Sequence, residues 1–251
     1  MSEKSSNFAV AKLKVMKIAI LGQGNVGTNL HHAFALKHIQ TELINSWDLS
    51  NLPLADVYIY AVADKALAEV ASKVSAPKAL HLHTSGTMPI DVFGADKPHA
   101  GVLYFFQSFS KESLVDDWSS IPVFIEGRNI DDVAAIYTLA QTLSDRIYEC
   151  NQRDRERLHI AGVFANNYSN LMYRIAAEVL RGTQIPFEAL LPLIDRTAEK
   201  VHGMSPRDAQ TGPAQRGDEA VIQHHVEILK ATPYAELYQA LAALIEKERN
   251  R

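Results

Sequence analysis

The sequence predicts an α/β fold, in which a doubly wound, mostly parallel sheet is followed by an all-helical C-terminal domain. Residues 16–150 alternate short apolar runs with helical patterns, which is typical of βαβ units. From about residue 152 the strand signals stop, and long helical patterns follow one another. We therefore expect one domain over residues 15–151 and a second over residues 152–251.

Six apolar runs in the N-terminal part predict strands. Several of them, such as VYIYAV, are apolar almost throughout, which suits a sheet covered on both faces. The predicted strands span residues 16–21, 39–45, 55–62, 78–85, 101–106 and 121–127, and the predicted helices between them span residues 27–38, 64–74 and 130–143.

Four long helices are predicted in the C-terminal part. Asp218 is expected to be the N-cap of the third helix. Thr232 is expected to cap the fourth, with Pro233 at its first helical position. The four predicted helices span residues 153–182, 186–203, 218–230 and 232–250.

Composition excludes several classes of function. The chain has 251 residues, 47% of them hydrophobic, and a formal net charge of -4, which gives no electrostatic footprint for nucleic acid or an anionic membrane. No apolar run approaches the roughly 20 residues that span a bilayer. The single cysteine, Cys150, allows no internal disulfide and fits a reducing compartment. We expect a cytoplasmic protein that binds neither nucleic acid nor a membrane.

A glycine-rich loop stands between the first predicted strand and the first predicted helix. In KIAILGQGNVG, Gly22, Gly24 and Gly27 have the G-x-G-x-x-G spacing. The first glycine permits a tight turn, the second lets the backbone approach a pyrophosphate, and the third lets helix pack on strand. This context predicts a Rossmann dinucleotide-binding domain. The residues expected at the cofactor are Gly22, Gln23, Gly24, Asn25, Val26 and Gly27.

The end of the second predicted strand bears on the choice between NAD and NADP. NAD sites usually carry an acidic residue there, which binds the ribose 2′-hydroxyl. Here Asn45 and Ser46 occupy the tip, Trp47 follows, and Asp48 comes late. The missing acid favours NADP, although no arginine stands nearby to receive a 2′-phosphate. We expect NADP, with NAD as the alternative and Ser46 as a contact.

The ends of the later strands are small or polar, as the reactive end of a nicotinamide cofactor requires. Ala63 in AVAD and Ser85 in HTSG are the residues expected there. His81 and His83 alternate on one predicted strand and raise the question of a metal pair. Because no cluster of Cys, Asp or Glu accompanies them, we expect packed histidines and no metal site.

Six segments, spread over nearly the whole sequence beyond residue 15, carry a resemblance to a known family. They are KIAILGQGNVG, AVAD, HTSGTMPIDVF, VLYFFQSFS, ERLHIAGVFANNYSN and TGPAQRGD. In these segments the chain resembles Rossmann-like NADP oxidoreductases. The N-terminal domain of that family is similar to those of deazaflavin-dependent NADP oxidoreductase and pyrroline-5-carboxylate reductase. Its helical C-terminal domain is of unknown function and 6-phosphogluconate-dehydrogenase-like.

The chain departs from the family and its relatives at two places. Many relatives have a His-Pro pair where this chain has Tyr104 and Phe105. Related hydroxyacid dehydrogenases carry a catalytic lysine three residues before an Asn-Asn pair. Here Asn166 and Asn167 are present, but the lysine position is Val163. Hydroxyacid chemistry driven by a lysine is therefore not expected.

Four polar residues form one stripe on the long helix at about 100° per residue: His159, Asn166, Asn170 and Tyr173. One interpretation is a stripe that faces solvent or a second subunit. The other is a stripe that faces the nicotinamide, with His159 as proton donor or acceptor and Asn166 and Asn170 orienting a carbonyl or the cofactor carboxamide.

The segment TGPAQRGD interrupts the helical part. Arg216 is suited to a bidentate contact with a carboxylate or phosphate, which would make this segment half of an active site. Alternatively, Asp218 caps a helix and Arg216 forms its salt bridge. We adopt the first interpretation, with His159, Asn166, Asn170 and Arg216 as the candidate catalytic residues.

The leading functional prediction is an NAD(P)-dependent oxidoreductase that acts on a small polar substrate in an interdomain cleft. A non-catalytic NADP-binding redox sensor or assembly protein is the alternative, and a methyltransferase that binds S-adenosylmethionine is a third, less consistent with the later strands. We also expect a homodimer built through the helical domain, because Leu237, Leu241 and Leu244 stand at helical spacing in the last helix.

Overall fold

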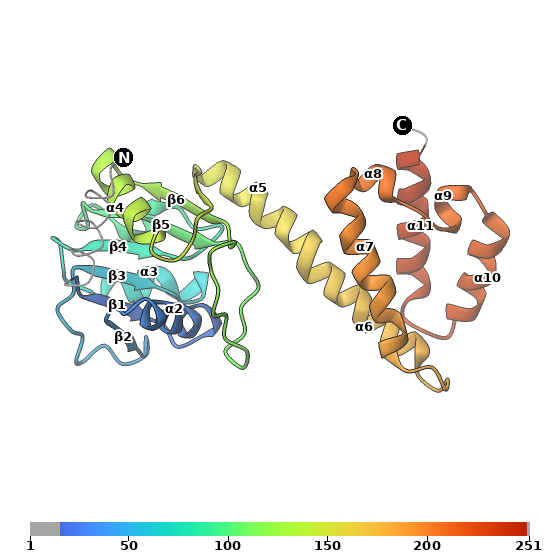
Figure 1. The fold of residues 1–251 in the computed structure, drawn as a ribbon, viewed down its shortest axis with the longest axis horizontal. Helices are drawn as coiled ribbons and strands as arrows, with labels where there is room; N and C mark the ends of the chain where they lie inside the picture. The colour runs from blue at the N-terminus through green and yellow to red at the C-terminus, as the bar shows by residue number, and fades with distance from the viewer. Residues whose placement is uncertain (1–15, 250–251) are drawn as a thin grey trace. The chain divides into compact units, whose positions relative to one another are not determined.

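The computed structural model describes residues 16–249, and its contacts divide the chain into two compact units, residues 1–167 and 168–251. The predicted fold class is confirmed: a mostly parallel sheet with covering helices comes first, and helices alone follow (Figure 1). The last strand ends at Glu149 and the next helix begins at Gln152. The predicted domain limit at residue 151 stays a prediction, since the contacts divide the chain 16 residues later, between Asn167 and Tyr168.

Seven strands form one sheet in the first unit, in the order β2-β1-β3-β4-β5-β6-β7. Strands β1 to β5 are parallel, whereas β6 is antiparallel to β5 and parallel to β7. The strand order reverses at β1, which is where such sheets form a ligand crevice. The strands are β1 (Ile18–Leu21), β2 (Thr41–Ile44), β3 (Val57–Tyr60), β4 (Leu80–His83), β5 (Ala100–Phe105), β6 (Val123–Gly127) and β7 (Ile147–Glu149). The sequence did not predict β7, which is a short, half-exposed edge strand.

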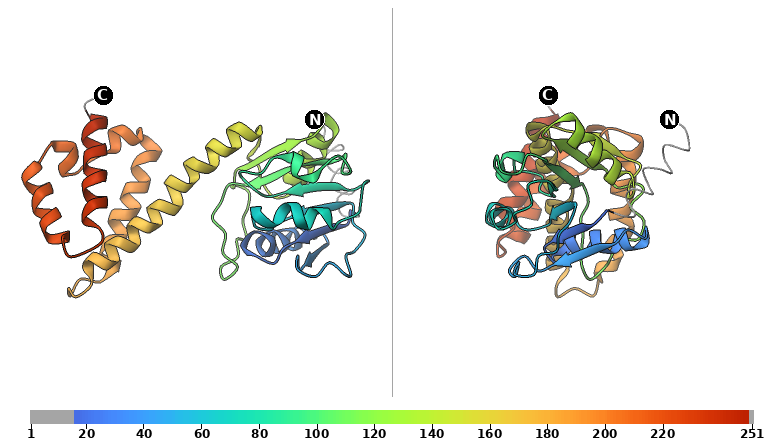
Figure 2. Two further views of the ribbon diagram at one scale, coloured as in Figure 1. Left: turned by 180° about the vertical axis from the view of Figure 1, so that it is seen from behind. Right: turned by 90° about the vertical axis from the view of Figure 1, so that its left-hand side faces the viewer.

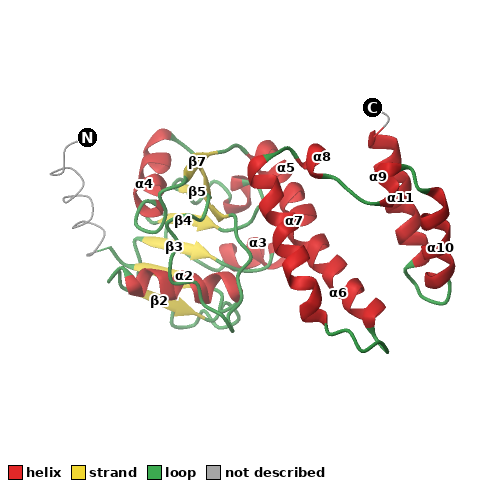
Figure 3. Cartoon of the chain, turned by 45° about the vertical axis from the view of Figure 1, so that its right-hand side comes forward, coloured by secondary structure: helices red, strands yellow, loops and turns green. Residues whose placement is uncertain are grey.

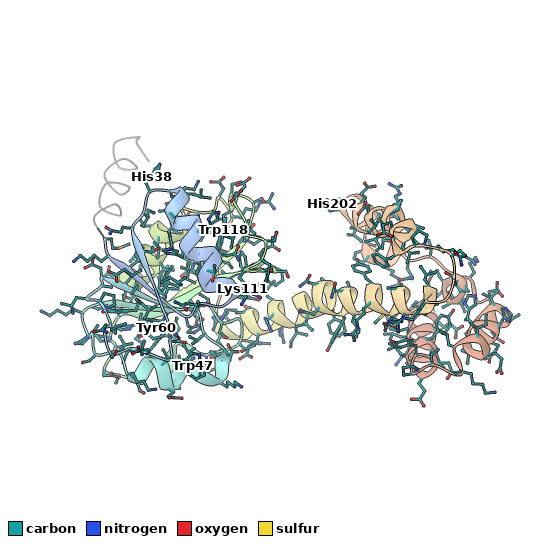
Figure 4. The ribbon with its side chains drawn as sticks, turned by 90° about the horizontal axis from the view of Figure 1, so that it is seen from below. His38, Trp47, Tyr60, Lys111, Trp118 and His202 are labelled. Carbon is teal, nitrogen blue, oxygen red and sulfur yellow. The ribbon has the colours of Figure 1, made fainter. Side chains whose placement is uncertain are left out.

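Helices cover both faces of this sheet, as Figure 2 shows from two sides. One core lies under α2 and α4 and includes Phe34 and Trp118; the other lies under α3 and includes Leu67 and Tyr60. Trp118 and Tyr60 are labelled in Figure 4. The covering elements are α2 (Asn25–Leu36), α3 (Asp64–Ser72), the 3₁₀ turn η1 (Ile90–Phe93) and α4 (Ile130–Ala140).

A continuous helical segment leads from the first unit into the second. The sequence predicts one α-helix here, and the structure instead inserts a π-helical segment, η2, between two α-helices. A π segment depends on i→i+5 bonds, which a hydrophobic pattern does not reveal. The elements are α5 (Gln152–Gly162), η2 (Val163–Tyr168) and α6 (Ser169–Leu180).

The second unit contains helices only, coloured red in Figure 3. Helix α11 packs against α9 and α10, and α7 packs against α8. No helix among residues 16–249 is both long enough and apolar enough to cross a membrane. The remaining elements are η3 (Phe187–Leu190), α7 (Leu191–Gly203), α8 (Pro206–Ala209), α9 (Pro213–Arg216), α10 (Glu219–Leu229) and α11 (Ala235–Arg249).

The two predicted helix caps in this unit have different outcomes. Asp218 accepts a hydrogen bond from the Val221 N–H and caps α10, as predicted. The prediction for Thr232 and Pro233 is wrong by a few residues, because α11 begins only at Ala235. The Thr232 hydroxyl instead donates to the Leu229 carbonyl at 2.7 Å and accepts from the Tyr234 N–H at 3.2 Å, which forms a turn between α10 and α11.

Two histidines of β4 are packed inside the first unit, as expected. His81 and His83 are both 0% exposed. The His81 ring bonds the Tyr60 hydroxyl at 2.9 Å and the Ala76 carbonyl at 2.9 Å. Burial lowers the pKa of both rings, and it lowers that of His83 to about 3, helped by the Arg155 guanidinium. Both histidines are therefore neutral in the folded protein near neutral pH.

Burial of His83 predicts a loss of stability in mild acid. The unfolded chain binds a proton on this ring near pH 6.5, whereas the folded chain does so only near pH 3. The free energy of unfolding should therefore fall as pH drops through this window, by at most about 1.4 kcal/mol per pH unit from this group. His83→Asn should flatten the dependence, measured by urea unfolding and the fluorescence of Trp118, which is 2% exposed.

The matched control is His38→Asn. His38 is exposed, and its φ of 57° lies in the left-handed region, which asparagine tolerates. This variant should keep the wild-type dependence on pH. Equal slopes in the His83 and His38 variants would contradict the assignment of the acid sensitivity to His83.

Candidate active site

The turn from β1 into α2 is closed by two glycines that contact backbone. Gly22 has a φ of 118°, which L side chains rarely adopt, and a Cβ there would overlap the Ala61 carbonyl at the end of β3. A Cβ on Gly27 would overlap the Gly22 carbonyl. The two glycines therefore bring the N-terminus of α2 close to the carboxyl ends of β1 and β3.

Gly24 differs from both neighbours, because nothing in the described structure requires glycine there. It is exposed, it is the N-cap of α2 with a φ of −82°, and an added Cβ would meet no heavy atom within 4 Å. Gln23 and Asn25 beside it are also exposed, whereas Val26 packs against the core. The turn is thus an open cradle at a helix N-terminus, where backbone N–H groups favour an anion.

A loop that follows β5 is tied to this cradle. Asn29 is 0% exposed and donates from Nδ2 to the carbonyls of Asn25 and Ser110, both at 2.9 Å. Its Oδ1 accepts from the Val115 N–H at 3.0 Å, and Asn25 Oδ1 accepts from the Lys111 N–H at 3.3 Å. These bonds hold the loop beside the first turn of α2.

The tip of β2 offers no free carboxylate. Asp48 accepts from the Ser50 N–H at 3.1 Å and from its hydroxyl at 2.6 Å, and these bonds lower the pKa of Asp48. Asn45 Oδ1 accepts from the Trp47 N–H at 3.1 Å. The Trp47 side chain, labelled in Figure 4, is 87% exposed, and Ser46 is half-buried.

The loop after β4 is held by its own side chains. The Ser85 hydroxyl accepts from the N–H groups of Thr87 at 3.1 Å and Met88 at 3.0 Å. The Thr87 hydroxyl donates to the Asp64 carboxylate at 2.5 Å, in the first turn of α3. Ala63, the N-cap of α3, is exposed. Ser85 therefore shapes the loop with its hydroxyl, and its predicted contact with a cofactor stays a prediction.

A cleft of about 350 Å³ lies between the end of β5 and the helical segment α5–η2, within the first unit. We call it the β5–α5 cleft. Two aromatic rings, amides, a hydroxyl and the His159 ring line it, and these residues include no Lys, Arg, Asp or Glu. The lining residues are Tyr104, Phe106, Gln107, Ser108, His159, Gly162, Val163, Ala165, Asn166 and Asn167.

His159 projects from α5 toward the carboxyl ends of β4 and β5. Its Nδ1 lies 3.1 Å from the Tyr104 hydroxyl. Both side chains press on Gly86, where an added Cβ would lie 2.7 Å from His159 Nδ1 and 2.9 Å from Tyr104 Cζ. Partial burial raises the pKa of Tyr104, so its hydroxyl keeps its proton at neutral pH.

The first turn of α5 is fixed by a buried arginine one turn before His159. Arg155 is 0% exposed; one terminal nitrogen pairs with the Glu126 carboxylate on β6, and the other donates to the Met88 carbonyl at 2.6 Å. The side chain of Asn151 caps the same helix by accepting from the Asp154 N–H at 3.0 Å. These bonds fix the first turn of α5, which carries His159 one turn later.

The π segment η2 begins at Val163 and presents Asn166 and Asn167 to the cleft. His159 and Asn166 of the predicted stripe both line the cleft, and the role of the stripe stays a prediction. Val163, at the position where related hydroxyacid dehydrogenases carry lysine, lines the cleft as well. π segments occur frequently at functional sites.

The two other candidate residues lie in the second unit. Asn170 in α6 is exposed. Arg216 ends the short helix α9, is exposed, and forms no salt bridge with Asp218 among the described residues. Asp218 caps α10, so the alternative interpretation of TGPAQRGD is right about the helix cap and wrong about a salt bridge between Arg216 and Asp218.

Sequence reasoning missed three residues around His159. Tyr104 was noted only as a departure from a family pattern, and Arg155 and Gly86 were not singled out. A charged residue four positions before a candidate histidine is a signal for Arg155, but its burial depends on the pairing with Glu126. No sequence signal identifies Gly86, because its need for glycine arises from contacts with β5 and α5.

Comparison with known proteins supports the fold class over almost the whole chain. A "putative NADP oxidoreductase" from Bacteroides fragilis superposes with a TM-score of 0.87 at 37% identity, over 92% of this chain and 98% of that one. A protein from Thermotoga maritima matches with a TM-score of 0.75 at 17% identity, over 93% and 100%. A reductive aminase from Aspergillus terreus in complex with NADPH and ethyl levulinate matches with a TM-score of 0.64 at 14% identity, over 92% and 93%.

The fold is that of a Rossmann-like domain followed by a helical C-terminal part. At 37% identity over nearly the full length of both chains, the chain belongs to the family of the Bacteroides fragilis NADP oxidoreductase. Residues 121–245 also match a domain of unknown function, DUF2520, which begins before β6 and ends within α11. No curated protein matches the sequence.

Proposed function

We propose that the protein is an NADP-dependent oxidoreductase that acts on a small polar substrate in the β5–α5 cleft. The observation that carries this proposal is the place of His159. It stands at the carboxyl ends of β4 and β5, in a sheet whose β1–α2 turn is an open glycine cradle. In sheets of this kind a dinucleotide lies across those strand ends, with its pyrophosphate at the helix N-terminus.

The cofactor is NADP, and the residues present fit it. Gly24 leaves room for a pyrophosphate, which accounts for a glycine that the protein's own packing does not need. Asp48 is turned to Ser50, so its carboxylate is not free to bind a ribose 2′-hydroxyl as the acid of an NAD site does. Ser46 and Asn45 supply polar groups there. Solved relatives of the same fold include a reductive aminase in complex with NADPH and an imine reductase in complex with NADP+.

The lining of the cleft suits a neutral group of the substrate, such as a carbonyl or an imine. Its polar atoms belong to amides, hydroxyls and one imidazole. When bound, a nicotinamide supplies a hydride to the substrate carbon. His159, as an imidazolium, supplies the proton to the oxygen or nitrogen that takes up the π electrons of the reduced double bond, and a new proton from water then reloads His159. Asn166 orients the accepting group, and Asn170 and Arg216 are proposed to bind the rest of the substrate.

A non-catalytic NADP-binding sensor or assembly protein is the second candidate. Val163 in the cleft favours it, because the position lacks the lysine of the related dehydrogenases. The two candidates agree on the cofactor and differ on turnover. For both we propose a cytoplasmic location, on the basis of the single cysteine and the ordinary composition.

Gly24→Val should abolish tight cofactor binding without unfolding the protein. The side chain would occupy the space where the pyrophosphate lies, while no protein atom within 4 Å opposes a Cβ. We expect at least a tenfold weaker affinity, equivalent to about 1.4 kcal/mol, in a fluorescence titration with NADPH. Gly203→Val, also at a glycine with open surroundings, is the control and should bind as the wild type does. Unchanged NADPH affinity in folded Gly24→Val would show that the site is elsewhere.

His159→Ala and Arg216→Ala should keep NADPH affinity and lose activity. A screen of small keto acids, imines and aldehydes with NADPH and NADH comes first. For His159→Ala we expect turnover to fall by about 10²–10⁴-fold, the usual contribution of a positioned proton donor. For Arg216→Ala we expect a raised KM for anionic substrates. His202→Ala and Arg157→Ala, at exposed positions, are the controls. No turnover with any substrate would favour the sensor.

We also propose that the protein is a homodimer through the helical unit. An apolar groove of about 530 Å³ in this unit is lined by α6, α10 and α11 and includes Leu237 and Leu241. Leu241 is 42% exposed, and Leu244 is 55% exposed. Exposed apolar side chains gathered in one groove are a feature of interaction surfaces.

Sedimentation should give twice the 27.8 kDa mass of one chain at micromolar concentration. Leu244→Lys should shift the equilibrium toward the single chain, because burying a charge in an apolar interface is unfavourable. Gln239→Lys introduces the same charge at another exposed position of α11 and should leave the dimer intact. A single-chain mass for the wild type would contradict the proposal.

A further inference from the structure

Tyr104 and His159 form a hydrogen-bonded pair at the wall of the β5–α5 cleft. The hydroxyl and Nδ1 are 3.1 Å apart, and the ring centroids are 6.2 Å apart. Tyr104 packs edge to face on Phe106, and Gly86 leaves no spare room beside either ring. The pair is therefore fixed from β5, from α5 and from the loop after β4.

The pKa of Tyr104 bears on the protons of this pair. Desolvation raises the pKa of Tyr104, so the hydroxyl keeps its proton at neutral pH and has it to donate to Nδ1. A neutral imidazole carries one proton, and the nitrogen that accepts from a hydroxyl is the unprotonated one. With the Tyr104 hydroxyl donating to Nδ1, the ring proton is on Nε2. Among the described residues Nε2 has no hydrogen-bond partner, and His159 lines the cleft.

We propose that Tyr104 is a positioning residue that holds His159 with its Nε2–H directed into the cleft. This rests on the proposed function, in which His159 gives a proton to the substrate. A hydroxyl suits this task because it both donates and accepts. When His159 is protonated, the Nδ1–H donates to the Tyr104 oxygen and the ring keeps its direction.

Tyr104 is not itself the acid of the reaction. Loss of its proton would leave a phenolate in a partly buried place, and the same desolvation that raises the pKa of Tyr104 disfavours that charge. The proton that reaches the substrate oxygen or nitrogen therefore comes from Nε2 of His159 in its doubly protonated form, and the electron pair of that N–H bond stays on the ring, which becomes a neutral imidazole with its Nδ1–H on the Tyr104 oxygen. Water then reprotonates His159, and the Tyr104 O–H bond is intact throughout.

The test is nitrogen-15 NMR of the histidine side chains without cofactor or substrate. At pH 8.5 imidazole side chains are ordinarily neutral, and the resonances separate protonated from unprotonated ring nitrogens. The chain has 10 histidines, so His159→Gln assigns the signal. We expect Nε2 protonated in the wild type, and Nδ1 shifted upfield by an accepted hydrogen bond. In Tyr104→Phe, Nδ1 should move to the position of a nitrogen without such a bond.

Tyr104→Phe keeps the ring that packs on Phe106 and removes only the hydroxyl, so the variant should fold. Tyr148→Phe is the matched control, because it removes a hydroxyl from a half-exposed tyrosine of β7 that stacks on Phe124. It should leave the His159 signals unchanged. A proton on Nδ1 in the wild type, or an unchanged Nδ1 resonance in Tyr104→Phe, would overturn the proposal.

The outcome is separate from that of the proposed function. Suppose that NADPH binds and that Gly24→Val prevents its binding. If the Nδ1 resonance of His159 is then the same in the wild type and in Tyr104→Phe, only the positioning role fails. If NADPH does not bind, the cofactor assignment fails, whatever the tautomer. With a substrate in hand, Tyr104→Phe should lower kcat and leave NADPH affinity unchanged, whereas a purely structural role would show as a lower Tm alone.

Discussion

The turn from β1 into α2 depends on the absence of two Cβ atoms. With any side chain at Gly27 the helix would have to move away from Gly22, and with any at Gly22 the turn would have to move away from Ala61 and the end of β3. The rest of the first unit follows from this contact. It brings the first N–H groups of α2 to the switch point of the sheet, and Asn29 in the same helix then ties down the loop after β5. Helix α2 thus positions both the glycine cradle and the loop after β5 on one side of the cleft.

The other side of the cleft is anchored by a charge pair. Arg155 is fully buried, and removing a partner from a buried pair costs several times more than the pair contributes. Its bonds to Glu126 and to the Met88 carbonyl join α5 to β6 and to the loop after β4. Gly86 in that loop lets His159 and Tyr104 approach each other. The geometry of the cleft therefore depends on the backbone positions that Arg155 and Gly86 fix.

Much of the fold could be predicted from the sequence because apolar runs and glycine spacing are local signals. Strands β1 to β6 and helices α2 to α4 lie within the predicted segments or a few residues of them. The π segment and β7 could not be predicted, since the first depends on i→i+5 bonds and the second on pairing with β6. At the candidate site, His159 and Asn166 came from helical spacing. Tyr104 and Gly86 matter through contacts with each other and with His159, which lies on a separate segment 55 residues beyond Tyr104, and no spacing encodes these contacts.

The lining of the cleft has polar side chains but no Lys, Arg, Asp or Glu, and both facts limit its chemistry. Val163 replaces the lysine that related dehydrogenases use, and no charged side chain appears among the lining residues. His159 and Tyr104 are half-buried at this wall, and an uncharged hydroxyl can pair with the imidazole in both its neutral and its protonated form. The pairing of His159 with Tyr104 is therefore consistent with the neutral carbonyl or imine that we propose at this wall.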